Sequence, residues 1–207
     1  CRIREVVGAV QRLQQLEPAQ AVNLVGFSLG GNFCLRVGAR AVEAGLRLEQ
    51  VVAVCPVIDP EHTLVRLERG WALYRQYFVW KWRRSLRRKQ AAWPQLYDLS
   101  EALELDNLTD MTDHLVCKYG GYPSLQEYLH GYAIVDDALA SLVHPTRIIS
   151  AADDPIIPAS DLARMARPAA LSITCTTLGG HCGFYDGQGE LTWIEREVLA
   201  TLLRPQQ

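Results

Sequence analysis

The chain has 207 residues, of which 49% are hydrophobic and 21% are charged, and its formal net charge is −2 at pH 7. These values lie near the average for globular domains, and the length fits one domain with room for an inserted subdomain. The small net charge provides no general attraction to nucleic acid, so we expect no nucleic-acid partner. No apolar run reaches the roughly 18 residues that a transmembrane helix needs.

The cysteines are spread singly along the chain, which argues against a zinc ribbon or a thioredoxin-type site. Three of them, Cys34, Cys55 and Cys175, lie inside apolar runs and are predicted to be buried, reduced thiols. Reduced thiols favour a cytoplasmic location. The other cysteines are Cys1, Cys117 and Cys182.

The first 60 residues alternate between helix-like and strand-like segments. Apolar residues at helical spacing predict a helix over 2–16, and the short apolar run 21–25 predicts a buried strand. A glycine-rich turn then leads into a helix over about 29–44, which Gly45 closes. The β-branched segment 50–59 predicts a second buried, parallel strand.

Residues 61–140 contain no comparable run of β-branched residues. We therefore predict a helical insertion over 61–143 between two core α/β segments, 1–60 and 144–207. One long helix is expected in it, because apolar residues recur at spacings of three and four: Leu67, Trp71, Tyr74, Phe78, Trp82 and Leu86.

After the insertion the alternation resumes. A strand beginning at 145 runs into an acidic turn, a short helix covers 161–169, a strand begins at 171, and an amphipathic helix covers 190–203. This order predicts an α/β fold with a parallel sheet and helices on both of its faces. The polar clusters follow strands, which places them at the carboxyl edge of the sheet, where such folds build their sites.

The segment Gly26-Phe27-Ser28-Leu29-Gly30 joins a predicted strand to a predicted helix. In that setting it is typical of a tight turn that exposes the serine oxygen above the sheet. We expect side chains at Gly26 or Gly30 to collide with the neighbouring strand or helix. The N–H of Leu29 begins the helix and is placed to stabilise an oxyanion. The alternative is a glycine-rich packing or phosphate-binding turn.

A serine hydroxyl becomes a good nucleophile only when a base removes its proton. His181 lies in a Gly-Gly-His turn after the last strand, which we expect to be flexible and uncrowded, and no other histidine follows a strand in such a turn. Asp153 and Asp154 follow the preceding strand, and an aspartate there can orient the histidine. We select Asp154, which precedes Pro-x-x-Pro, and expect Asp153 to face solvent or cap the turn.

These motifs resemble the α/β-hydrolase superfamily, whose triads have the same chain order of Ser, Asp and His. The resemblance covers essentially the whole chain and is carried by GFSLGGN (26–32), DDPIIP (153–158) and GGHCGF (179–184). The last two motifs are more narrowly similar to the YheT-like branch of predicted hydrolases, which includes eukaryotic lipid-handling members. Two weaker matches, LDNLTD (105–110) and GGYPSLQEYL (120–129), are similar to the cap region of that branch.

The resemblance implies hydrolysis of carboxylic (acyl) esters through an acyl-enzyme, with Ser28 as nucleophile, His181 as base, and Asp154 as its orienting carboxylate. It implies an apolar or lipid-like acyl group and no metal or organic cofactor. In this family several strands, and the loop that supplies a second oxyanion N–H, precede the helix that opens this chain. We therefore expect a preceding segment or chain to complete the fold, since losing one such donor typically lowers turnover ~10²–10³-fold. Cys182 replaces a more usual apolar residue, which we treat as neutral variation.

The segment VWKWRRSLRRKQAAW (79–93) places six Lys and Arg residues among aromatic ones. One interpretation is an interfacial helix that makes peripheral contact with anionic lipid at a membrane. The interpretation we favour is a cap helix with a solvated basic face, an apolar face packed inward, and partial neutralisation by the acidic segment 96–113. Such a cap would shape an apolar acyl pocket and exclude water.

Three functions are compatible with the sequence. The first is a serine esterase or lipase-like hydrolase. The second is a non-catalytic α/β-hydrolase-like chain that binds a ligand or a partner, which gains support if the natural chain begins near residue 1. The third keeps the triad but acts on a thioester, an amide or a phospholipid ester.

Overall fold

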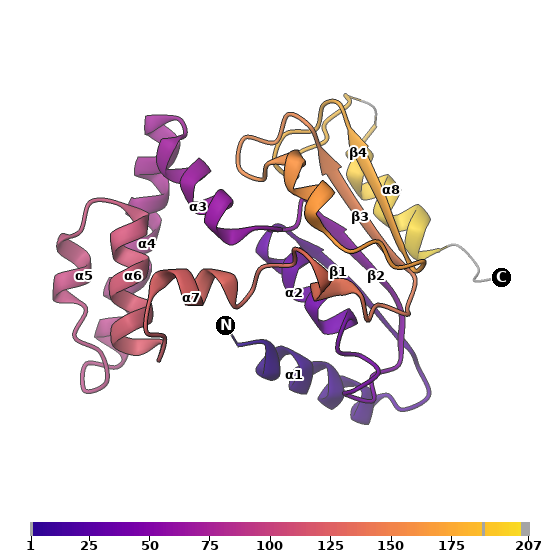
Figure 1. Cartoon of the computed structure of the whole chain (residues 1–207), viewed down its shortest axis with the longest axis horizontal. Coiled ribbons are helices and arrows are strands. Elements are labelled where there is room, and N and C mark those ends of the chain that lie inside the picture. The colour runs from indigo at the N-terminus through magenta and orange to yellow at the C-terminus, as the bar shows by residue number, and fades with distance from the viewer. Residues whose placement is uncertain (1, 188, 204–207) are drawn as a thin grey trace. The chain divides into compact units, whose positions relative to one another are not determined.

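The computed structural model describes residues 2–187 and 189–203, so Cys1 lies outside the described residues. The chain divides into two compact units, residues 1–59 with 133–207 and residues 60–132 (Figure 1). Residues 133–143, which the sequence assigned to the insertion, group with the first unit. They do so through backbone hydrogen bonds, such as the 2.9 Å bond from Ile134 N–H to the carbonyl of Ile58.

The first unit is built on a four-stranded sheet with the order β1-β2-β3-β4, in which all neighbours are parallel. The strands are β1 (Val22–Phe27), β2 (Leu48–Val54), β3 (Thr146–Ala151) and β4 (Leu171–Thr176). The helices are α1 (Ile3–Leu16), α2 (Leu29–Gly38) and α8 (Trp193–Leu202), with short 3₁₀ helices at Asp137–Leu139 and Ala159–Arg164. The helix expected to reach residue 44 therefore ends at Gly38, and the helix expected over 161–169 is a 3₁₀ helix that ends at Arg164.

Helices α2 and α8 cover opposite faces of the sheet (Figure 1). Val51 of β2 lies against Gly38 of α2, whereas the next residue, Val52, packs in a buried cluster with Ile194 and Val198 of α8. Successive side chains of a strand point to opposite faces, so the two helices must lie on different sides of β2. The predicted α/β fold with a parallel sheet and helices on both faces is confirmed.

The two edge strands are less buried than the sequence predicted. Val25 and Phe27 of β1 are 37% and 44% exposed, and Cys175 of β4 is exposed rather than buried. Within the described residues, β1 pairs only with β2 and β4 only with β3. An apolar run can therefore form a partly exposed edge strand, because the composition of a strand does not tell how many neighbouring strands it pairs with.

Residues 60–132 form a helical unit, as the predicted helical insertion required. Its helices are α3 (Pro60–Arg69), α4 (Ala72–Ala92), α5 (Ser100–Glu104), α6 (Leu108–Tyr119) and α7 (Leu125–His130). The single long helix predicted through Leu67 and Leu86 is wrong, because the chain breaks at Gly70 and Trp71. Trp71 takes non-helical dihedrals (φ −55°, ψ 128°) and is 80% exposed. The three-and-four spacing of apolar residues therefore runs through two separate helices, α3 and α4.

Helix α4 has an apolar face that packs inside this unit, as the favoured interpretation of the basic segment required. Val79 and Leu86 of α4 join a buried cluster with Leu99, Ala102, Leu108 and Met111. Arg83, one helical turn after Val79, pairs with Asp106 of the acidic segment at 2.8 Å. None of the helices within residues 2–187 and 189–203 is both long enough and apolar enough to cross a bilayer.

The turn after β1 requires glycine at two positions, only one of which the sequence identified. A Cβ on Gly26 would lie 2.3 Å from the carbonyl oxygen of Gly30, and a Cβ on Gly31 would lie 3.1 Å from the carbonyl oxygen of Gly26 and 3.2 Å from Cβ of Pro56. A Cβ on Gly30 meets nothing within 4 Å, so the collision expected there is wrong. The close approach of strand to helix therefore depends on Gly26 and Gly31.

We predict that Gly26→Ala destabilises the protein by about 3 kcal/mol or more, because overpacking against backbone cannot be relieved by rotating a side chain. Gly30→Ala is the matched control on the same turn and should change stability by no more than about 1 kcal/mol, since alanine fits the space and favours a helix. Urea unfolding monitored by circular dichroism measures both. Equal destabilisation by the two substitutions would contradict the packing described here.

Candidate active site

Ser28 sits between the last residue of β1 and the first residue of α2, in a strained backbone conformation. Its dihedrals are φ 52° and ψ −121°, a region that non-glycine residues rarely occupy. The turn is held by a 2.8 Å hydrogen bond from Ser28 N–H to the carbonyl of Val54, and the Ser28 carbonyl accepts from the N–H groups of Asn32 and Val57. These bonds tie the serine to the end of β2.

Asp154 occupies the turn after β3, and its carboxylate is almost completely buried, with 2% of the side chain exposed. Its Oδ1 accepts hydrogen bonds from the backbone N–H groups of Ile156 and Ile157 at 2.8 and 3.0 Å. Burial raises the pKa of Asp154, but the bonds from His181 and from these two N–H groups outweigh it, so the pKa lies below its ordinary value. The DDPIIP motif thus folds into a cradle for an ionised carboxylate.

His181 lies in the turn after β4 and connects the other two side chains. Its Nδ1 is 2.8 Å from Asp154 Oδ2, and its Nε2 is 3.0 Å from Ser28 Oγ. Residues 28, 154 and 181 come from three separate strand ends, and the structure brings all three together. This is the arrangement that the sequence predicted for them.

The turn that carries His181 is crowded, contrary to the expectation of an uncrowded turn. A Cβ on Gly179 would lie 2.5 Å from ring atoms of Phe184, and Gly180 takes φ 57°. Asp153 stabilises the same turn, because its Oδ1 accepts the N–H of Gly180 at 2.8 Å. Asp153 therefore caps the turn before the histidine, which is one of the two roles expected for it.

Leu29 opens α2, and its backbone N–H is among the first four of the helix, which have no intrahelical acceptor. Such an N–H lies at the positive end of the helix dipole and next to the Ser28 hydroxyl in the chain. The arrangement can bind a partial negative charge beside Ser28.

Two cysteines that the sequence treated as unremarkable lie beside this site. Cys55 follows β2 directly and is fully buried, and Cys182 follows His181. One ligand atom from each of Cys55, His181 and Cys182 lies within 4.8 Å of the others. Both cysteines have positive φ (42° and 66°), like Ser28, so strained residues gather at this edge. The sequence held no local signal for this, because Cys55 lies inside the segment 50–59 that was predicted as one strand.

These neighbours set the charge state of the histidine. Burial lowers the pKa of His181, but the hydrogen bond to Asp154 and the adjacent Cys182 raise it more, to about 9. The hydrogen bond with Cys55 and the proximity of His181 lower the pKa of Cys182 to about 5 against the effect of burial. The bond to Cys182, together with burial, raises the pKa of Cys55. Asp154 and Cys182 thus both favour the protonated form of His181.

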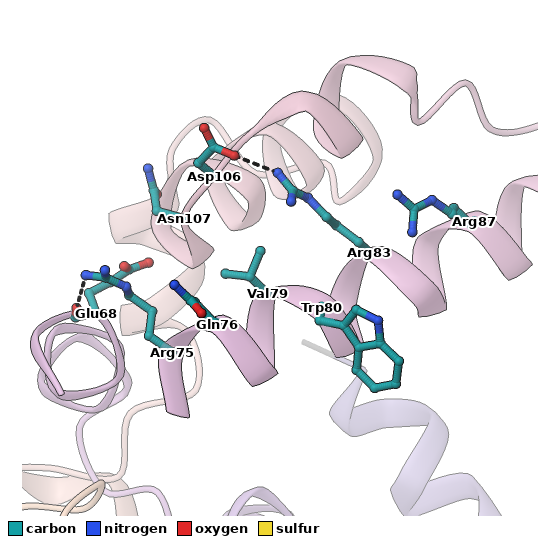
Figure 2. Close-up of a pocket in the computed structure, with 9 residues that line it drawn as sticks. All are labelled: Glu68, Arg75, Gln76, Val79, Trp80, Arg83, Arg87, Asp106 and Asn107. Atoms are coloured by element: carbon teal, nitrogen blue, oxygen red, sulfur yellow. Dashed lines mark hydrogen bonds and ion pairs between the residues drawn. The ribbon is translucent and has the colours of Figure 1, made fainter. Parts of the chain in front are cut away.

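A hollow of about 660 Å³ lies within the helical unit along α4 (Figure 2). It is lined by three arginines that follow one another along one side of α4: Arg75, Arg83 and Arg87. Val79 lies between the first two, and Asp106 lies opposite. Arg83 donates to Asp106 and Arg75 donates to the carbonyl of Glu68 (Figure 2). Arg83 is thus paired with a carboxylate and Arg75 with a neutral carbonyl, so the acidic segment neutralises this helix in part.

The chain belongs to the α/β-hydrolase family. A family model described as the alpha/beta hydrolase family matches residues 2–191. Solved structures with the same fold include an alpha/beta fold family hydrolase from Bacillus anthracis, with a TM-score of 0.53, 15% identity and coverage of 86% of this chain and 67% of that one. Candida antarctica lipase A in its closed state gives a TM-score of 0.53 at 14% identity, over 84% of this chain and 48% of that one.

Among curated proteins, the chain is similar to monoacylglycerol lipase ABHD2. The Bos taurus protein is 26% identical over 219 residues, and the Homo sapiens protein is 25% identical over 219 residues. Both alignments cover 92% of this chain and 49% of the relative. The chain therefore spans about half the length of the curated relatives that it matches.

We predict that Cys182→Ala lowers the pKa of His181, because it removes one of the two groups that hold the pKa near 9. A raised pKa lowers the fraction of neutral imidazole, the form that can accept a proton, at every pH below that value. The variant should therefore shift the titration midpoint of His181, followed by NMR in metal-free buffer, to lower pH. Cys175→Ala, which removes an exposed thiol on β4, is the matched control. An unchanged midpoint in Cys182→Ala would contradict the assigned cause.

Proposed function

We propose that the chain is the catalytic part of a serine hydrolase that cleaves carboxylic esters, with Ser28, His181 and Asp154 as its triad. One observation carries the proposal. The unbroken series of contacts runs from Ser28 Oγ to His181 Nε2 at 3.0 Å and from His181 Nδ1 to Asp154 Oδ2 at 2.8 Å. The three side chains come from segments far apart in the sequence, so these contacts form only because the fold brings the three segments together.

In the proposed reaction, Ser28 Oγ attacks the ester carbonyl carbon while its proton passes to Nε2 of neutral His181. The carbonyl oxygen becomes an oxyanion beside the N–H of Leu29. Collapse of the tetrahedral intermediate breaks the bond to the alkoxy oxygen, which takes the proton from His181. Water then repeats the sequence on the acyl-serine and releases the carboxylic acid. Asp154 holds the imidazole with Nε2 toward Ser28 and stabilises its charged form.

An apolar or lipid-like acyl group is the substrate class that we favour. The similar curated proteins are named as monoacylglycerol lipases, and the motifs around Asp154 and His181 are those that the sequence assigned to a YheT-like branch with lipid-handling members. Both supports are distant, since the identities are near 25%.

The exposed side of α4 is the surface that we propose for peripheral contact with an anionic lipid layer. Tyr77 and Trp80 stack on each other and are exposed, with Lys81 over the Tyr77 ring at 5.3 Å and Arg84 over the Trp80 ring at 5.5 Å. Aromatic rings next to basic groups suit the boundary between acyl chains and phosphate headgroups. We also propose a cytoplasmic location, because the five described cysteines form no disulfide.

We predict that a fluorophosphonate probe labels the longest natural polypeptide that contains this chain and that Ser28→Ala abolishes the labelling. The probe phosphonylates the oxygen of a serine, with loss of fluoride, only when a neighbouring base activates that serine. Ser160→Ala removes another hydroxyl of the same unit and is the matched control, in which labelling should persist. In-gel fluorescence and mass spectrometry of the labelled peptide give the readout.

Labelling that survives in Ser28→Ala would overturn the nucleophile assignment. Absence of labelling in the folded wild-type polypeptide would instead favour the non-catalytic binding chain. The exposed apolar residues of β1, Val25 and Phe27, would then be the first surface to test for a partner.

We also predict that kcat/KM for p-nitrophenyl esters rises with acyl length, by up to about fourfold per methylene group. That ratio corresponds to the roughly 0.8 kcal/mol gained by burying one CH₂. If α4 contacts anionic lipid, the long-chain esters should also be cleaved faster in anionic vesicles than in zwitterionic ones. A preference for acetate would contradict an apolar acyl site, and equal rates in both kinds of vesicle would contradict the lipid contact.

A further inference from the structure

We propose that Cys55, Cys182 and His181 form a binding site for a thiophilic metal ion such as Zn²⁺ or Cd²⁺, and that coordination through Nε2 withdraws His181 from Ser28. The geometry behind the proposal is the convergence of two sulfurs and one imidazole nitrogen within 4.8 Å of one another. A serine triad needs the histidine but neither of these two cysteines.

The ligand set has the chemistry of a known class of metal centre. Two thiolates and one imidazole are soft to borderline donors, which select d¹⁰ cations over Mg²⁺ or Ca²⁺. Zinc binds sulfur at about 2.3 Å and nitrogen at about 2.0–2.1 Å, so tetrahedral ligand atoms lie roughly 3.5–4 Å apart. The three groups therefore need to close by only about 1 Å, and the fourth position is left for solvent.

The fold holds the ligands from separate elements. Cys55 follows β2, with its thiol 3.8 Å from the carbonyl of Gly180. Cys182 comes from the turn after β4, with its thiol 3.8 Å from the carbonyl of Val54. Each cysteine thus contacts the backbone of the turn that carries the other. Such reciprocal contacts restrict the relative movement of the two thiols, which lowers the entropic cost of binding an ion between them.

Asp154 completes the arrangement expected around a metal-bound histidine. Histidine ligands usually donate their second ring N–H to a carboxylate, which orients the ring and raises its basicity. His181 already makes this contact through Nδ1, at 2.8 Å from Asp154 Oδ2. Coordination through Nε2 would keep that bond and break the contact with Ser28 Oγ. Coordination through Nδ1 would break the bond to Asp154 instead.

Either mode of coordination removes one of the two triad contacts. This part of the inference rests on the proposed function, because only a hydrolase can be inhibited in this way. Metal binding itself does not rest on it, since the ligand set exists whether or not the chain hydrolyses esters. The two questions are therefore separated by measuring binding and activity independently.

The test is a titration of the reduced, metal-free polypeptide with Cd²⁺, followed by the ultraviolet charge-transfer band between thiolate and cadmium and by equilibrium dialysis. We expect the first equivalent to give the band. Cys55→Ser, Cys182→Ser and His181→Gln should each weaken binding by at least about tenfold. The matched control, Cys117→Ser with Cys175→Ser, removes two exposed thiols and should leave the affinity unchanged.

Loss of the band in the control variant, or its persistence at full affinity in both Cys55→Ser and Cys182→Ser, would overturn the proposal. Cys55 is buried, so its substitution can impair folding, and circular dichroism therefore accompanies each titration. If Cys55→Ser is unfolded, Cys182→Ser and His181→Gln give the decisive comparison. In the activity arm, Cd²⁺ should abolish ester hydrolysis and EDTA should restore it. A bound ion without inhibition would overturn the withdrawal of His181 but not the site.

Discussion

The close approach of β1 to α2 is the constraint on which the rest of the site depends. The backbone of Gly26 lies so near the first turn of α2 that a single added carbon would overlap the carbonyl of Gly30. This contact forces the chain to turn within one residue, and Ser28 takes the strained dihedrals that result. The strain is offset by hydrogen bonds that Ser28 exchanges with the segment after β2, and that segment carries Cys55. One packing contact thus places the serine, the start of the helix and the buried thiol relative to one another.

The parallel sheet extends this effect to the other strands. Parallel neighbours end at the same edge, so the residues after β1, β2, β3 and β4 converge whatever their separation in sequence. The turns after β3 and β4 are further joined to each other, since Asp153 accepts from Gly180 while Asp154 contacts His181. The histidine is therefore held by the backbone before it as well as by its own ring. A site with so little freedom suits chemistry that depends on a fixed direction of proton transfer.

The residues that the sequence identified best are those whose signal is local. Ser28, Asp154 and His181 each follow a predicted strand within a short motif, and a chain order links them, so no knowledge of contacts was needed. Features that depend on distant contacts were not predicted. The proximity of Cys55 to Cys182 depends on which strands are neighbours in the sheet. The exposure of Val25, Phe27 and Cys175 depends on which strands lie at an edge. The break at Gly70 was missed for another reason. Helical spacing persists across it, because α3 and α4 both contribute to one apolar cluster.

The imidazole of His181 is the point at which the two proposals compete. A general base needs a free nitrogen lone pair on the side facing the serine, and a metal ion takes the same lone pair. The cysteines affect this competition even without an ion, because Cys182 raises the pKa of His181 and so keeps the ring protonated over a wider range of pH. Protonation and metal binding both leave the ring unable to accept the proton of Ser28. A thiol beside the histidine therefore makes the proposed base dependent on its surroundings in a way that an apolar residue at position 182 would not.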